Sequence, residues 1–149
     1  MSGGELVIRG SAGSRLGFAM KGGTILVDGN AGRWSAQMTL GGRIVVTGEV
    51  GDLAGESMYR GQFFVRDTAI EQRIGGNVEI AGLSKADQGF LAELFDRYEV
   101  GAAVDEFVQI IPLSSGRHSY RLFRPDVSKA GEKRAVRTAQ ICQQPQEAV

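Results

Sequence analysis

The sequence predicts an all-β fold, a right-handed parallel β-helix of about four 19-residue coils, followed by one α-helix, a short strand pair and a polar tail. Three observations predict it. Gly4, Gly23 and Gly42 open units spaced 19 residues apart, each unit begins with a four-residue apolar or mixed run, and a Gly-x-x-Gly corner follows each run. A fixed period of this size is typical of one structural unit stacked on copies of itself.

The period excludes several other repeat folds. Nineteen is not a multiple of six, so the hexapeptide β-helix does not fit, and the chain lacks both the Gly-Gly-x-Gly-x-Asp run of calcium-binding rolls and a Leu-x-x-Leu-x-Leu frame. The predicted strands are Glu5–Ile8, Thr24–Val27, Arg43–Val46 and Gln62–Val65. We therefore expect successive coils roughly 4.8 Å apart, the ordinary spacing of paired strands.

The corners between strands carry the repeated glycines. Stacked corners need either a positive φ angle or a close approach of the backbones, and glycine permits both. The fourth unit is degenerate, because Asp67 and Ile70 stand where the corner glycines belong, so the repeat is expected to end near residues 66–82. The predicted structural turn residues are Gly10, Gly13, Gly29, Gly32, Gly48 and Gly51.

Strand alternation separates inward from outward columns. Two apolar columns are expected to face inward: Leu6, Ile25, Ile44 and Phe63, and Ile8, Val27, Val46 and Val65. The column between them is also apolar and should face outward, so it needs a cover, either the C-terminal segment of the same chain or a second subunit. Its residues are the predicted interface positions Val7, Leu26, Val45 and Phe64.

Beyond the coils the apolar pattern becomes helical. Ser84 can cap a helix over residues 85–98, whose apolar face must dock on another surface, and Gly101 is the expected stop signal. A strand over 106–111, a turn at 114–116 and a second strand over 119–123 follow. The predicted domains are the β-helix repeats over 1–82, the capping helix and strands over 83–124, and a flexible or partner-ordered tail over 125–149.

The first coil has no preceding helix to seal it. The chain enters this coil at Gly3 and Gly4, and a short stack of coils has little stability to spare. We therefore expect the open first coil to abut another chain.

Composition limits the function classes. The 149 residues are 42% hydrophobic with a net charge of zero, which does not predict binding to nucleic acid or to an anionic membrane. No apolar stretch has membrane-spanning length and no signal peptide follows Met1, so a cytoplasmic location is expected. Cys142 is the one cysteine, which excludes an intramolecular disulfide bond.

The search for reactive residues predicts no catalytic, cofactor-binding or metal site. His118 is the one histidine and Cys142 lies in the tail, so the usual zinc ligand sets and a Ser-His-Asp triad lack their members. No Gly-x-Ser-x-Gly elbow, phosphate loop or dinucleotide fingerprint occurs. No column of acidic residues forms of the kind used by β-helix glycosidases, and Asp52 is instead expected to pair with Arg33 of the preceding coil.

The repeated phrase over residues 20–32, seen again up to Gly51, resembles the GXGXG-type β-helix domain at the C-terminus of the glutamate synthase large subunit. The same domain occurs in the β-helix subunit of formylmethanofuran dehydrogenase and in the third-domain subunit of N-methylglutamate synthase-type enzymes. The resemblance covers roughly residues 3–82, and the segments 85–98, 107–111 and 120–123 are similar to the closing part of these subunits. The chain has fewer coils than these relatives typically have.

The resemblance implies a scaffold that supports and spaces catalytic domains and carries no catalytic residue of its own. The expected function is a non-catalytic structural subunit of a glutamate synthase-like complex of an amidotransferase and a flavin synthase, without a cofactor or metal and with other protein subunits as partners. One alternative is the equivalent scaffold of a formylmethanofuran dehydrogenase complex. The other is a stand-alone hydrolase built on a β-helix.

Overall fold

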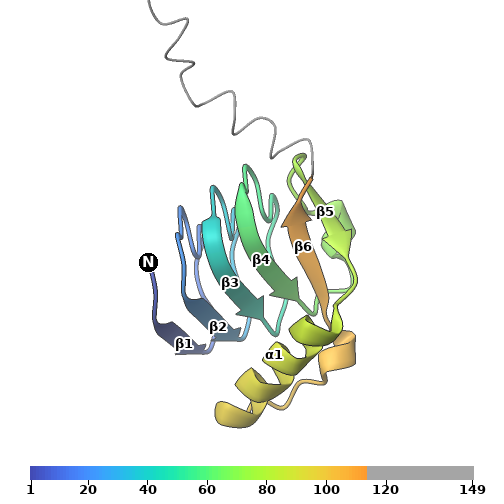
Figure 1. Cartoon of the computed structure of the whole chain (residues 1–149). Helices are drawn as coiled ribbons and strands as arrows, with labels where there is room; N and C mark the ends of the chain where they lie inside the picture. Colours follow the sequence, from blue (N-terminus) through green and yellow to red (C-terminus); the bar gives the residue numbers. More distant parts are fainter. Residues whose placement is uncertain (114–149) are drawn as a thin grey trace, which may run out of the picture. The chain divides into compact units, whose positions relative to one another are not determined.

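The computed structural model describes residues 1–113, which form mostly β structure with a single α-helix in this part of the chain. The repeats form a parallel sheet of β1 (Glu5–Arg9), β2 (Thr24–Asp28), β3 (Leu40–Val46) and β4 (Arg60–Val65), which lie side by side in chain order (Figure 1). Each strand pairs with the next at a shift of 19 residues, except at an irregularity at the start of β3. The predicted period is therefore the register of the sheet.

The return path of each coil is also stacked. Isolated parallel bridges join Ala12 to Ala31 and Ala31 to Val50, and backbone hydrogen bonds connect the segments between them. The three parallel pairings of β1 to β4 define a β-solenoid of about three turns. The prediction of about four coils is not confirmed, because the segment after β4 departs from the repeat.

The end of the solenoid beyond β4 is closed by antiparallel strands. β6 (Val108–Pro112) pairs with β4, and β5 (Val78–Ala81) pairs with β6, which completes a six-stranded sheet. The predicted strand over 106–111 exists, and it begins two residues later because the 3₁₀ turn η2 (Val104–Glu106) precedes it. The sequence did not predict β5, nor the 3₁₀ turn η1 (Ile70–Gln72) before it.

The predicted helix is α1 (Lys85–Arg97). Ser84 caps it as expected, since its side chain accepts a hydrogen bond from the Asp87 backbone N–H and the Asp87 side chain returns to the Ser84 backbone. The helix ends before the predicted stop at Gly101. Glu99 adopts a left-handed φ of 50°, and Val100 N–H donates to Phe95 O at 2.9 Å, the pattern of a Schellman cap.

Two apolar clusters hold these elements together. The inner cluster lies inside the solenoid and includes both columns predicted to face inward except Leu6, which is 46% exposed in the first coil. The outer cluster lies between the sheet and α1, which packs against one face of the solenoid (Figure 1). Its buried members are Leu26, Val45, Phe64, Leu91, Leu94, Phe95, Val100 and Phe107. The predicted turn at 114–116, the strand over 119–123, the tail, His118 and Cys142 lie outside the described residues.

Candidate functional site

The outward apolar column is covered by the chain's own helix. Leu26, Val45 and Phe64 are fully buried in the outer cluster, and Val7 packs against its edge partly buried. The rings of Phe64 and Phe90 lie 5.8 Å apart, and the Arg43 guanidinium lies 4.2 Å from the Phe90 ring centroid. Of the two covers considered, the structure has the C-terminal segment of the same chain, so these residues are not an open surface in the described part of the molecule.

A network of hydrogen-bonded polar side chains forms where α1 begins beside β4 and β6. The Asp87 carboxylate accepts hydrogen bonds from Ser84 Oγ at 2.6 Å and from Gln62 Nε2 at 2.7 Å. Gln62 Nε2 also donates to Gln109 Oε1, and Gln109 Nε2 donates to Gly82 O at 2.9 Å. These contacts fix the helix start to both the last parallel strand and the closing strand.

The charge of Asp87 is stabilised within this hydrogen-bond network. Burial pushes the pKa of the Asp87 carboxyl upward, but the hydrogen bonds from Ser84 and Gln62 outweigh it, and the nearby Arg43 adds to them. The net pKa lies below the ordinary aspartate value. Asp87 is thus held ionised as a structural cap, not poised to exchange a proton near neutral pH.

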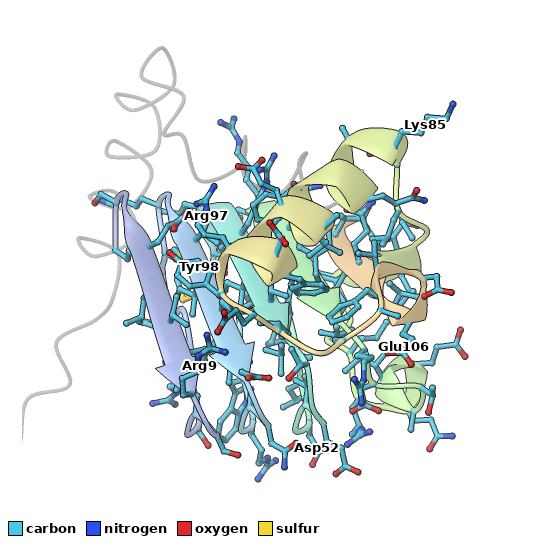
Figure 2. The ribbon with its side chains drawn as sticks, turned by 90° about the horizontal axis from the view of Figure 1, so that it is seen from below. Arg9, Asp52, Lys85, Arg97, Tyr98 and Glu106 are labelled. Atoms are coloured by element: carbon cyan, nitrogen blue, oxygen red, sulfur yellow. The ribbon has the colours of Figure 1, made fainter. Side chains whose placement is uncertain are left out.

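A second polar cluster ties the end of α1 to the first coil. Arg97 forms ion pairs with Glu5 at 2.9 Å and with Glu93 at 2.6 Å, and Tyr98 OH donates to Glu5. Arg9 donates to Tyr98 O and pairs with Asp28 at 3.2 Å. Figure 2 shows Arg9, Arg97 and Tyr98 gathered where α1 ends over β1 and β2. The hydrogen bond from Tyr98 lowers the pKa of Glu5 and raises that of Tyr98.

The corner glycines are explained by close backbone approach. A Cβ atom at Gly29 would lie 2.5 Å from Gly10 O, and one at Gly51 would lie 2.7 Å from Arg33 N. Gly10 and Gly13 have open space instead, because they belong to the first coil. The structure thus places the predicted turn residues at the corners, where close approach requires glycine from the second coil onward and the φ of 123° favours it at Gly10.

In the degenerate fourth unit, side-chain oxygens accept hydrogen bonds that backbone oxygens accept in the regular repeats. Val50 N–H donates to Asp67 Oδ2 at 3.0 Å, whereas the equivalent N–H of Ala31 donates to a backbone oxygen, Glu49 O. Arg73 also pairs with Asp67 at 2.6 Å, and Ala69 N–H donates to its Oδ1 atom. In the same way Ser57 N–H donates to Asn77 Oδ1 at 2.7 Å. Asp67 and Asn77 therefore replace backbone acceptors at two points, while the parallel bridge from Ala54 to Ile74 continues the backbone ladder between them.

The return segments 14–19, 33–38 and 52–57 adopt left-handed backbone angles at every second residue, a feature the sequence analysis missed. Three successive coils repeat this pattern, and most of the residues in it are not glycine. The signal available in the sequence was the small-residue column Gly17, Ala36 and Gly55. The left-handed positions are Arg15, Gly17, Ala19, Trp34, Ala36, Met38, Leu53, Gly55 and Ser57.

These return segments also carry three exposed apolar side chains and a partly buried tryptophan, which together we call the arc surface: Phe18, Trp34, Met38 and Leu53. Phe18, Met38 and Leu53 are exposed. Two guanidinium groups lie over the Trp34 ring, with Arg33 at 4.6 Å and Arg15 at 5.3 Å from its centroid. Aromatic and arginine side chains are enriched at the centres of protein interfaces, so this surface is a candidate contact site.

The remaining polar features are structural or open to solvent. Arg33 and Asp52 form the predicted cross-coil ion pair at 3.7 Å, with both side chains more than half exposed. A hollow of about 480 Å³ lies at the corner lined by Asn30, Glu49, Arg66 and other polar residues. Across residues 1–113 the structure contains no group of three or more His, Cys, Asp or Glu side chains placed to hold a metal ion.

Within the same range, α1 is too short and too polar to cross a membrane. Comparison with protein-family models and with curated proteins found no match to this chain.

Proposed function

We propose that this chain is a non-catalytic structural subunit of a multi-subunit, glutamate synthase-like enzyme that combines an amidotransferase with a flavin synthase. The observation that supports it most is the use of the buried carboxylates. Asp67 and Asp87 accept hydrogen bonds that hold the end of the solenoid and the start of α1. In residues 1–113 every buried side-chain nitrogen and oxygen has a hydrogen-bond partner, so none of these atoms is left unpaired to bind a substrate.

The proposal assigns the partner contacts to the arc surface. The outward column cannot serve this purpose, because α1 covers it. The arc surface combines exposed apolar side chains with the stacked Arg15, Trp34 and Arg33. The proposal keeps the right-handed sense of the coil and a cytoplasmic location as predictions.

The test is a search of the neighbouring genes for an amidotransferase and a flavin synthase, followed by reconstitution of the chain with the proteins they encode. The isolated chain should be colourless and inert, and glutamine-dependent synthesis should require all three proteins. Full activity without the chain, or turnover by the isolated chain that a point mutation abolishes, would contradict the proposal.

The arc surface can be tested without disturbing the fold. Leu53 and Met38 have left-handed φ angles of 60° and 55°, which asparagine adopts more readily than either. Leu53→Asn together with Met38→Asn should therefore weaken association while the melting temperature stays level or rises. Ser57→Asn is the matched control, because Ser57 has a φ of 56° and is already polar. Unchanged association in the double variant would remove the arc surface from the proposal.

A further inference from the structure

The first strand is the open edge of the sheet. β1 is the terminal strand in the order β1-β2-β3-β4-β6-β5, and it pairs only with β2 among the described residues. Leu6 is 46% exposed and Phe18, from the same coil, is 51% exposed, although their counterparts in the next coils are better covered. An exposed edge with apolar neighbours is a template for pairing with another strand.

The free backbone groups of this edge can be assigned. Thr24 N–H donates to Gly4 O at 2.9 Å, and Gly10 N–H donates to Asp28 O at 3.1 Å, so the even-numbered residues of β1 bond toward β2. Backbone groups alternate in direction along a strand. Glu5, Val7 and Arg9 therefore direct their N–H and C=O groups toward the open edge.

We propose that a second copy of this chain occupies the edge, with the two β1 strands paired antiparallel about a twofold axis at Val7. This arrangement sets Glu5 opposite Arg9 of the second copy, and Leu6 opposite its Ile8. The backbone N–H and C=O groups of Glu5, Val7 and Arg9 then exchange hydrogen bonds with the partner strand. A shift to the neighbouring register sets Glu5 or Arg9 opposite the uncharged Val7, and a larger one opposes like charges.

The closed end of the solenoid provides a precedent within the molecule. There β4 accepts the antiparallel strand β6, with Phe63 opposite Ile110 inside the core. Leu6 and Phe63 belong to the same inward column, so the pairing of Leu6 with Ile8 of the second copy would bury the first coil in the same way. A twofold contact between identical patches is also the commonest form of homo-oligomer.

The internal contacts of the two charged residues leave them able to pair again. Glu5 accepts one bond from Arg97 and one from Tyr98, and each carboxylate oxygen has a further lone pair. Arg9 uses one donor on each of two nitrogens, toward Asp28 and Tyr98 O, out of five N–H donors. This inference does not depend on the proposed enzyme complex.

The first test is the mass of the full chain in solution by light scattering. The 15.9 kDa chain should elute at twice that mass. Glu5→Arg or Arg9→Glu alone should yield monomers, because each opposes like charges. An equimolar mixture of the two variants should restore the dimer, because each Arg then faces a Glu. Melting curves of the single variants separate lost pairing from lost folding, since both residues also make internal contacts.

Cross-linking supplies a second, register-specific measurement. In a Cys142→Ser background, Val7→Cys should form an intermolecular disulfide on mild oxidation, because directly opposed residues in a hydrogen-bonded pair lie about 5.5 Å apart between Cα atoms. Asp52→Cys, exposed at a corner, is the control that should not cross-link. A chain that stays monomeric at high concentration, a dimer insensitive to both charge changes, or Val7→Cys capture by a different protein would each overturn the proposal.

Discussion

The two ends of the solenoid differ in how the backbone of their last parallel strand is covered. At the far end, β6 and β5 cover β4, and the side chains of Asp67 and Asn77 accept from backbone N–H groups that would otherwise face a next coil. At the near end, β1 has no equivalent cover among the described residues. At the far end, side-chain oxygens thus replace part of the backbone ladder where the sequence departs from its repeat.

This difference explains why the fourth unit is degenerate. A glycine at position 67 would keep the repeat but would remove the carboxylate that binds Val50 N–H and Arg73. In the first unit Gly10 has a φ of 123°, which favours glycine by itself, whereas Gly13 is kept although it has open space around it. Gly13 is therefore an interior-type corner residue in a coil with no neighbour on that side among the described residues, which fits a coil that continues into another strand.

The largest expected change in stability comes from comparing a substitution at the closed end with one at the open end. Ile110→Ala removes a buried side chain of the closing strand and should lower the free energy of unfolding by about 2–5 kcal/mol. Leu6→Ala changes the inward column that ends at Phe63, the partner of Ile110, and should cost less than about 1 kcal/mol in the monomer, because Leu6 is 46% exposed. Urea denaturation of dilute protein measures both. Equal losses would mean that the two ends are equally covered.

The side-chain cap should have the next largest effect. Asp67→Ala leaves Val50 N–H and Arg73 without their partner and should cost roughly 1–3 kcal/mol. Hydrogen exchange at the Val50 amide should accelerate more than at Ala31, whose acceptor is backbone. Thr68→Ala is the neighbouring control. Unchanged protection of Val50 would show that the carboxylate does not close the ladder.

The start of α1, next to the closed end, should lose stability in acid. The folded pKa of Asp87 is depressed, so its contribution is present above the unfolded pKa of about 3.9 and is lost as pH falls through the lower folded value. Asp87→Asn should flatten this part of the profile, and Ser84→Ala should cost about 1 kcal/mol at neutral pH. Thermal melting between pH 6 and pH 2 gives the comparison. An identical acid profile in Asp87→Asn would exclude this carboxylate as the source.

The smallest effect is expected at the other end of α1, near the open coil. Glu99 has a φ of 50°, a conformation that glycine adopts without strain. Glu99→Gly should raise the free energy of unfolding by up to about 1 kcal/mol. Gly101→Ala, whose added Cβ atom meets nothing within 4 Å, is the control and should change little. A loss of stability in Glu99→Gly would show that the Glu99 side chain makes a compensating contact.

The parts of the fold that repeat were predictable from sequence. The 19-residue spacing gave the register of β1 to β4, and Ser84 marked the helix start, because both depend on local patterns. The cover of the outward column stayed open between two alternatives, since an apolar stripe indicates a partner without naming it. β5 is only four residues long, and the left-handed return segments use Trp34 and Leu53 where glycine would have given a signal.

The candidate sites were predicted less completely. The corner glycines and the Arg33–Asp52 pair follow from register alone, and the structure contains both. The arc surface and the substitution of Asp67 for a backbone acceptor depend on conformations and contacts that one-dimensional spacing does not encode. The open first coil was predicted from the absence of a capping element before Gly3 and Gly4, and β1 is the terminal strand of the sheet in the structure, while its contact with another chain stays a prediction.

The helix has a consequence for the order in which the molecule assembles. Coils that contact only their neighbours can form one at a time as the chain emerges. Here Glu5 and Arg9 are held by Arg97 and Tyr98, about ninety positions later in the chain. β1 is made before β2 to β4 but gains these contacts only after α1 has been made, so the first coil of the solenoid stays without them while the other coils form.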